Sequence, residues 1–428
     1  MTEPPTAAGR PARTTTVRPA RIAPKGLPPD GLAHLSDTHR ANLFDGTFLL
    51  PTAVLLDEPL RHNIALMADH CADHGVLLAP HGKTTMSPEI IVRQIEAGAW
   101  AITVATSWQA GAVVAMGVRR VLVANQVVDP ASVHHLDTLL LTHPGLELLT
   151  YVDSEDGLVL LERGLSPGAA LRLGVLLELG VPEGRTGLRD DTAALALAAR
   201  IAAGPLRLAG VAGFEGIIDG GDLDATLVLV DALLSRMATT ARRLRAEGLL
   251  DADVPIVTAG GSAYFDRVIA ALPDALRGTG YRVVVRSGCY VTHDSGGYER
   301  LSPLAGRLRT GARLRPALEV WAPVLSRPEP DRIIVGLGKR DISTDAGFPV
   351  PLRVRTGTGP PTAPPPGWRV VAVNDQHAYL DVPSDTPARV GDLVGFGISH
   401  PCTTFDKWQV MPLVDGDYGV IGRVHTSF

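Results

Sequence analysis

The sequence predicts an α/β protein in which a (β/α)8 barrel is followed by a smaller β domain. Between about residues 75 and 290, short apolar and β-branched runs alternate with longer helical patterns. These runs are apolar throughout, which is typical of strands buried on both faces of a parallel sheet. After residue 300 the pattern changes to short strand-like runs separated by Pro and Gly. Strands that follow a βα region in this way indicate a separate β domain.

Eight strands are expected in the barrel, and four of the segments between them have helical periodicity. The strands are residues 76–80, 101–106, 121–125, 146–152, 171–177, 208–214, 254–258 and 282–286, and the helices are 87–98, 108–117, 192–203 and 223–247. Eight βα units that close on themselves form a barrel. An open doubly wound sheet is the alternative, but the first strand lacks the G-x-G-x-x-G turn that would favour it.

The barrel is expected over residues 45–300 and the C-terminal β domain over residues 301–428. Strands of the β domain are expected at 318–325, 332–336, 369–373, 378–382, 393–398 and 418–424, and residues 45–56 could add another. Residues 1–44 are expected to be a flexible tail, because the first 31 are rich in Pro, Ala, Thr and Arg. Such a segment buries too little apolar surface to become ordered.

Composition excludes several classes of protein. The net charge of −5 and the aromatic content of 5% argue against a nucleic-acid surface. No apolar run approaches the roughly 20 residues that a membrane helix needs, and the N-terminus lacks the apolar core of a signal peptide. Three scattered cysteines are too few for a disulfide framework. We therefore expect a cytoplasmic protein that binds neither nucleic acid nor membrane.

Glycine-rich segments follow the last two barrel strands, where barrels often bind phosphate. They read Gly260-Gly261-Ser262 and Ser287-Gly288-Cys289-Tyr290. Glycines let backbone N–H groups approach an anion closely. Either segment alone can equally be a tight turn that caps a helix, but two in these positions indicate a phosphate site.

A lysine follows the first barrel strand, in Pro80-His81-Gly82-Lys83. At the mouth of a barrel such an amine loses hydration and becomes nucleophilic, so it can form an imine with a carbonyl cofactor. Most lysines are solvated surface residues. Lys83 differs from such surface lysines because the glycine-rich segments are expected at the same end of the barrel.

With these segments the sequence resembles the fold-type III pyridoxal-phosphate enzymes of the D-serine dehydratase and D-threonine aldolase family. The resemblance covers residues 45–428, and the bacterial amino acid deaminase branch is the most similar. It rests on five motifs in order: Pro80-His81-Gly82-Lys83, Gly184-Arg185-Thr186-Gly187, Gly260-Gly261-Ser262, Arg286-Ser287-Gly288-Cys289-Tyr290 and Gly397-Ile398-Ser399-His400-Pro401-Cys402.

The resemblance implies a cofactor site around Lys83, which would carry pyridoxal phosphate as a Schiff base. Arg185 would contact the phenolic oxygen of the cofactor. Glu215 lies where a partner of the ring nitrogen could sit, with a structural carboxylate as the alternative. Many relatives read Lys-Thr-His-Lys where this chain reads Lys83-Thr84-Thr85-Met86, so a role for that histidine does not transfer. The phosphate-binding set implied is Gly260, Gly261, Ser262, Ser287, Gly288 and Tyr290.

His400 and Cys402 place an imidazole and a thiol two residues apart, so that both face one side of an extended segment. Nitrogen and sulfur donors favour zinc. Alone, a buried histidine beside an inert cysteine explains the pair better. In the family, however, dehydratases use this pair for zinc, whereas aldolases tend to show H-x-D. His377 matches another histidine of the family, and is either a ligand, a proton-transfer group or a surface residue.

The sequence therefore predicts a lyase that uses pyridoxal phosphate and zinc to convert β-hydroxy D-amino acids into a keto acid and ammonia. Retro-aldol cleavage of the D-threonine aldolase type is the alternative. Racemisation needs no metal and would leave His400 and Cys402 without a role. A non-catalytic pyridoxal-phosphate carrier would consist of the barrel alone, so the expected C-terminal domain argues against it. A homodimer is expected, because enzymes of this fold usually complete the site across a two-fold interface.

Overall fold

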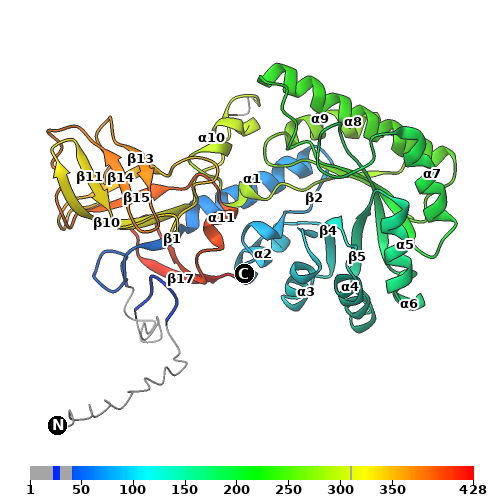
Figure 1. Cartoon of the computed structure of the whole chain (residues 1–428), viewed down its shortest axis with the longest axis horizontal. Coiled ribbons are helices and arrows are strands. Elements are labelled where there is room, and N and C mark those ends of the chain that lie inside the picture. Colours follow the sequence, from blue (N-terminus) through cyan, green and yellow to red (C-terminus); the bar gives the residue numbers. More distant parts are fainter. Residues whose placement is uncertain (1–22, 29–40, 309–310) are drawn as a thin grey trace, which may run out of the picture.

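The computed structural model describes residues 23–28, 41–308 and 311–428, and two separate sheets organise this part of the chain (Figure 1). The first is an eight-stranded parallel sheet with the order β2-β9-β8-β7-β6-β5-β4-β3. Its strands are β2 (Leu77–Leu78), β3 (Ile102–Val104), β4 (Arg120–Gln126), β5 (Glu147–Val152), β6 (Gly174–Leu179), β7 (Arg207–Gly213), β8 (Ile256–Ala259) and β9 (Arg282–Val285).

The first sheet closes into a barrel where β2 meets β3. His81 and Thr103 form a parallel bridge there. Trp100 N donates to Leu78 O over 2.7 Å, and Thr103 N donates to Pro80 O over 2.9 Å. All eight expected strands are present within a few residues of their expected bounds, so the predicted (β/α)8 barrel is confirmed.

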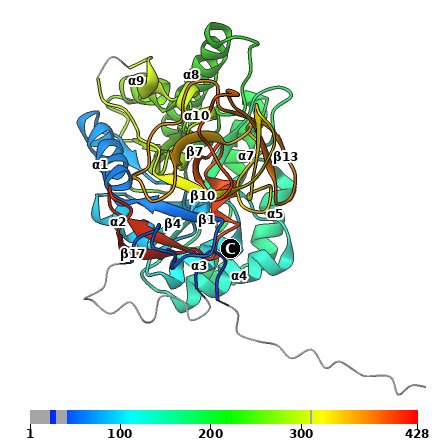
Figure 2. The same ribbon diagram turned by 90° about the vertical axis from the view of Figure 1, so that its left-hand side faces the viewer.

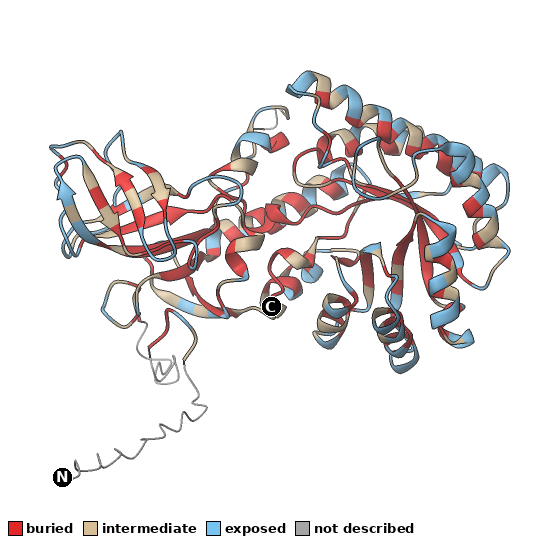
Figure 3. Ribbon diagram, viewed as in Figure 1, coloured by how far each residue is buried: buried red, intermediate tan, exposed pale blue. Residues whose placement is uncertain are grey.

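The barrel strands are buried on both faces, as their continuous hydrophobicity predicts. In β6 every residue is buried. Val175 and Leu177 belong to the large core cluster shared with the helices, whereas Leu176, between them, packs with Tyr151 and Ala212 inside the barrel. Figure 3 shows the same division in the helices, whose buried sides face the strands and whose exposed sides face outward.

Several helices around the barrel begin after a residue whose side chain caps them. The side chains of Ser87, Thr106, Asp129, Ser154, Asp190 and Asp222 each accept a hydrogen bond from a backbone N–H of the first turn. The helices are α1 (Asp57–Asp73), α2 (Pro88–Glu96), α3 (Ser107–Ala115), α4 (Pro130–Thr142), α5 (Glu155–Gly164), α6 (Pro167–Ala170), α7 (Asp191–Ala202), α8 (Leu223–Ala246), α9 (Phe265–Ala275) and α10 (Gly297–Leu301).

The second sheet has nine strands and is mostly antiparallel; Figure 2 views the molecule from this side, with the barrel behind. Its first strand, β1 (Thr52–Leu56), precedes the barrel in sequence and pairs antiparallel with β10 and parallel with β16. The others are β10 (Leu318–Glu329), β11 (Arg332–Val335), β12 (Val350–Arg355), β13 (Arg369–Val373), β14 (Ala378–Asp381), β15 (Leu393–Gly397), β16 (Val410–Val414) and β17 (Val420–His425), with the short helix α11 (Cys402–Phe405).

Two strands of the second sheet were not among those expected. Both β12 and β16 contain a proline, Pro351 and Pro412, a residue that argues against a strand because it cannot donate to the ladder. β12 pairs only with β15, and such an edge position tolerates proline.

The expected flexible tail, residues 1–44, lies mostly outside the described residues. The parts that are described contact the second sheet: Leu27 and Leu43 are buried in a cluster that includes Trp321. Lys25 also forms an ion pair of 3.3 Å with Asp341. We find no helix in the described ranges whose length and apolarity would let it cross a membrane.

Candidate active site

A cavity of about 180 Å³ lies at the mouth of the barrel, where the C-terminal ends of the strands meet. Each of the eight strands contributes a lining residue from its end or from the loop that follows. The lining comprises His81, Lys83, Ala105, Ala124, Asn125, Tyr151, Arg185, Thr186, Phe214, Gly261 and Arg286. Lys83, Arg185 and Gly261 were predicted to lie at one site, and the structure brings them together.

Lys83 sits in a single 3₁₀ turn, Gly82–Thr84, immediately after β2. Gly82 lets this turn lie against β3, because a Cβ there would come within 2.8 Å of the Ile102 side chain. The short turn thus holds the lysine at the cavity wall instead of allowing it to extend into solvent.

Positive charge surrounds the cavity. The Arg185 guanidinium lies 4.6 Å from the centre of the Phe214 ring. Arg286 is buried and donates to Thr258 Oγ1 over 2.7 Å and to Gly213 O over 2.8 Å. With Lys83 this makes three cations, and no Asp or Glu is among the described lining residues. An anionic ligand is therefore favoured here.

Two buried polar atoms of the lining residues have no hydrogen-bond partner, Nδ1 of His81 and the hydroxyl of Tyr151. Burial, together with the charges of Lys83 and Arg286, holds the pKa of His81 well below its ordinary value, so this ring is neutral. Burial raises the pKa of Tyr151 to about 12, which keeps its hydroxyl protonated. Buried polar atoms without partners fit a polar ligand in this cavity.

The loop after β8 is supported by Glu215, which is fully buried. Its carboxylate accepts from Gly260 N over 3.0 Å and from Gly261 N over 2.5 Å. Ser287 Oγ donates to the carbonyls of the same two glycines, each over 3.2 Å. Glu215 is therefore engaged with the backbone, as the alternative of a structural carboxylate expects, and it does not line the cavity.

Two other amides remain available in these loops. Within the described part of the chain, neither Ser262 N nor Gly288 N donates to a protein acceptor. Gly288 packs so closely on the lysine turn that a Cβ there would lie 2.6 Å from Thr84 Oγ1. A phosphate group bound here would accept from Ser262 and Gly288, while Gly260 and Gly261 provide close backbone approach.

Two predicted site residues lie away from the cavity. Tyr290 is buried in the core, and its hydroxyl is hydrogen-bonded to Gln94 Nε2 over 2.9 Å. His377 is exposed in the turn between β13 and β14. The structure therefore gives neither side chain a contact with Lys83 or with His400.

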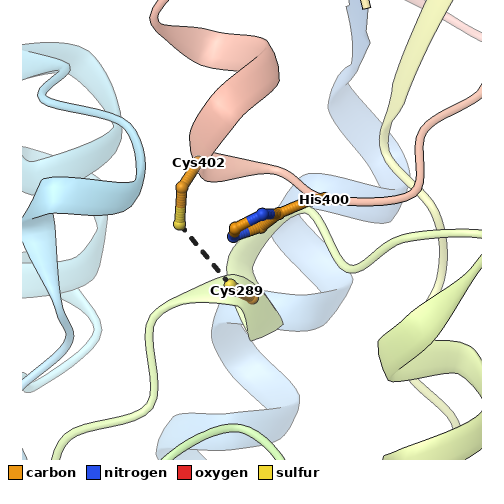
Figure 4. A group of neighbouring side chains, drawn as sticks. All are labelled: Cys289, His400 and Cys402. Atoms are coloured by element: carbon orange, nitrogen blue, oxygen red, sulfur yellow. Dashed lines mark hydrogen bonds between the residues drawn. The ribbon is translucent and has the colours of Figure 1, made fainter. Parts of the chain in front are cut away.

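The predicted metal pair lies beside the lysine turn, as Figure 4 shows. Cys402 Sγ is 3.4 Å from Thr84 Oγ1, the hydroxyl of the residue after Lys83. His400 Nδ1 is 2.7 Å from Asp345 Oδ2. The Sγ atom of Cys289 lies 3.7 Å from that of Cys402, and ligand atoms of Cys289, His400 and Cys402 all fall within 4.8 Å of one another.

The charges of this cluster suit metal binding. The hydrogen bond with Cys402, aided by Asp345 and opposed by burial, raises the pKa of His400 to about 9. Hydrogen bonds from Cys289 and His400 outweigh burial and hold the pKa of Cys402 well below its ordinary value. A thiolate thus lies next to an imidazolium, and a metal ion can replace the imidazolium proton. The donor set of nitrogen and sulfur fits zinc.

His400 also lines a second cavity of about 230 Å³ between the barrel mouth and the second sheet. Phe214 and Gly261 line both cavities, and Ser262 lines the second. The cavity lined by the predicted metal ligand His400 therefore adjoins the cavity lined by the predicted cofactor residues Lys83 and Arg185.

The chain resembles known proteins over most of its length. Residues 317–414 match the family model described as "Putative serine dehydratase domain". D-threonine aldolase of Arthrobacter sp. is 27% identical over 392 residues, which are 91% of this chain and 92% of that protein. The chain is therefore similar to proteins of the D-serine dehydratase and D-threonine aldolase family. The predicted resemblance is thereby confirmed.

Other relatives of the chain differ in the reaction that their names state. D-threo-3-hydroxyaspartate dehydratase of Delftia sp. (strain HT23) is 29% identical over 251 residues, 57% of this chain and 61% of that protein. Among solved structures, D-threonine aldolase from Filomicrobium marinum superposes with a TM-score of 0.73 at 24% identity, covering 89% of this chain and 95% of that one. Alanine racemases share the fold, so the alanine-racemase-like barrel is also confirmed.

Proposed function

We propose that the chain is a lyase that uses pyridoxal phosphate and zinc to dehydrate and deaminate β-hydroxy D-amino acids of the D-serine and D-threonine type. One observation carries the proposal: Cys402, one of the predicted metal ligands, contacts the turn that holds Lys83. Cys402 Sγ is 3.4 Å from the hydroxyl of Thr84, the residue that follows Lys83. An ion held by His400 and Cys402 would therefore lie close to the turn that carries Lys83.

The barrel-mouth cavity suits pyridoxal phosphate. Lys83 would hold the aldehyde carbon, Arg185 the phenolic oxygen, and the free amides of Ser262 and Gly288 the phosphate. The positive lining and the unpartnered atoms of His81 and Tyr151 support an anionic, polar ligand there. When bound, the cofactor supplies an electron sink for negative charge at Cα.

The residues of the chain then have separate tasks. Lys83 is the base that takes the α-proton. The electron pair left at Cα forms the Cα–Cβ double bond, and the hydroxyl leaves Cβ with the bonding pair. Zinc held by His400 and Cys402 would supply a Lewis acid, which makes the β-hydroxyl a better leaving group. The released enamine takes up one water and gives one keto acid and one ammonia.

Aldol cleavage is the second candidate, because the relative that matches 91% of the chain is a D-threonine aldolase. Cleavage would remove the proton of the β-hydroxyl instead of the α-proton, and would break the Cα–Cβ bond. We favour dehydration because Cys402 stands where the aldolases tend to carry a carboxylate. A thiolate suits zinc, whereas a carboxylate suits harder ions.

The deciding experiment incubates the purified holoenzyme with D-serine and with D-threonine, each with and without a chelator. We expect pyruvate or 2-oxobutyrate with an equal amount of ammonia, and loss of both on chelation. L-Serine and L-threonine are the matched controls. Glycine and acetaldehyde from D-threonine would replace this proposal with aldol cleavage, and isomerised amino acid alone would replace it with racemisation.

The homodimer and the cytoplasmic setting remain predictions. Size-exclusion chromatography with light scattering measures the mass of the native protein in solution. A monomer of 45.1 kDa with full activity would contradict the dimer.

A further inference from the structure

We infer that Cys289 is a third protein ligand of the metal, so that the site is Cys2His with a single position open to the substrate. This inference rests on the proposed function and goes beyond the pair His400 and Cys402. Cys289 lies 113 residues before Cys402 in the sequence, yet Figure 4 shows the imidazole and both sulfurs turned toward one another.

The spacing of the two sulfurs is that of ligands to one ion. Zinc–thiolate bonds are about 2.3 Å long, so two sulfurs at a tetrahedral angle lie about 3.8 Å apart. The Sγ atoms of Cys289 and Cys402 are 3.7 Å apart. A disulfide would require about 2.05 Å. The observed geometry therefore accommodates an ion between the sulfurs without any movement of the backbone.

The imidazole is oriented for the same ion. His400 Nδ1 is bound to Asp345 Oδ2 at 2.7 Å, which leaves Nε2 to face the sulfurs. Asp345 is itself held by Thr403, whose hydroxyl donates to Oδ1 over 2.9 Å. A carboxylate on the far nitrogen of a histidine ligand is the usual support of a zinc site. Asp345 is thus a positioning residue for His400.

Local packing holds Cys289 in this position. It follows Gly288, which packs against the lysine turn so closely that any side chain there would collide with His81 and Thr84. Cys289 is 6% exposed and begins a 3₁₀ turn, Cys289–Val291. A buried sulfur on a short, tightly packed turn is presented to the ion at little cost in conformational entropy.

Three protein ligands change what the ion can do. Two thiolates make the donor set soft and neutralise the charge of a divalent ion, which selects zinc over manganese or magnesium. Catalytic zinc with three protein ligands keeps one position for water or substrate. The ion can therefore take a single substrate oxygen, the β-hydroxyl, and the substrate carboxylate must be held by protein groups.

The first test counts sulfur ligands in the unmodified enzyme. X-ray absorption of the zinc-loaded holoenzyme is expected to show two sulfurs and one imidazole nitrogen in the inner shell. One sulfur would overturn the inference. A disulfide between Cys289 and Cys402 would also overturn it, and would appear as one free thiol instead of three in denaturant. Because no variant is needed, a folding defect cannot obscure the result.

The second test uses Cys289→Ser, with Cys71→Ser as the matched control because Cys71 is a buried free thiol on α1. In cobalt-substituted enzyme, Cys289→Ser should reduce the thiolate-to-cobalt absorption by about half. The zinc dissociation constant should rise at least about tenfold. Unchanged absorption and affinity would overturn the inference. Zinc bound by two sulfurs in an enzyme that dehydrates no β-hydroxy D-amino acid would instead refute the proposed function alone.

Discussion

The carboxylate of Glu215 binds the backbone amides of both Gly260 and Gly261, at 3.0 and 2.5 Å. These glycines form the loop that follows β8 at the cavity. Because both carboxylate oxygens are engaged with the loop, Glu215 acts on the cofactor site through the backbone. A role as the partner of the ring nitrogen would require the same oxygens.

Glu215→Gln is therefore expected to weaken cofactor binding. The amide nitrogen of Gln would face a backbone N–H that has no other acceptor, a cost of roughly 1–3 kcal/mol for a buried donor. A direct titration with pyridoxal phosphate should show a dissociation constant about tenfold higher, without a change in the absorption maximum. Glu96→Gln, on the exposed face of α2, is the control. Unchanged affinity with a shifted absorption maximum would favour the ring-nitrogen role.

Much of the fold was predictable because its signals are local. Buried parallel strands are apolar along their whole length, and β6 is an example in which all six residues are buried. Lys83 and Gly261 were predictable for a related reason, since residues that follow barrel strands meet at one end of the barrel. β16 was missed although all five of its residues are buried, and Pro412 alone does not explain this, because β10 was expected despite Pro323.

The remaining site residues depend on contacts between distant segments. Cys289 and Cys402 are 113 residues apart, and Asp345 lies 55 residues from His400. No periodicity in the sequence connects such positions. Tyr290 illustrates the same limit, since its place after Gly288 suggested the phosphate site but the turn directs its hydroxyl to Gln94, 196 residues away.

Lys83→Ala should abolish the absorbance band near about 420 nm that marks an imine of the cofactor. The keto acid rate should fall by at least about 10²-fold, because the base for the α-proton is lost as well. Lys339→Ala removes an exposed lysine and should leave both properties unchanged. A persistent band in Lys83→Ala would mean that another amine holds the cofactor.

Asp345→Ala should raise the zinc dissociation constant about 10- to 100-fold, because His400 loses the carboxylate that orients its ring. Asp345→Asn retains an acceptor oxygen, so its zinc affinity should lie between those of the wild type and Asp345→Ala. Competition with a chromophoric chelator measures all three. Asp406→Ala, at an exposed carboxylate after α11, is the control for charge. Equal affinities would mean that the bond to Asp345 contributes nothing to the metal site.

Glu319 makes the stability of the second sheet depend on pH. Burial raises the pKa of this carboxyl, although hydrogen bonds from Trp321 Nε1 and the Tyr418 hydroxyl oppose the shift. A raised pKa means that the folded state binds the proton more tightly. Proton binding by Glu319 therefore stabilises the folded state fully below its ordinary pKa of 4.5. This stabilisation is lost as the pH rises through the pKa that Glu319 has in the folded protein.

Glu319→Gln keeps an acceptor for both donors and removes the titration. The melting temperature of the variant relative to wild type should increase as the pH is raised from about 4.5 to 8. Differential scanning fluorimetry at half-unit steps measures this difference. If the difference in melting temperature is the same at every pH, the pKa of Glu319 does not change on folding.

Gly288→Ala tests whether the phosphate loop and the lysine turn must touch. The new Cβ would lie 2.6 Å from Thr84 Oγ1 and 2.8 Å from His81 Cβ, so the two segments must separate. Overpacking of this kind costs about 1–3 kcal/mol. Gly288 directly precedes Cys289, so a shift of its backbone would also move this proposed zinc ligand. The affinities for zinc and for the cofactor should therefore fall together. Gly145→Ala is the matched control, since a Cβ there meets no atom within 4 Å. Equilibrium titration with each ligand measures both affinities, and loss of one without the other would contradict the shared dependence on this contact.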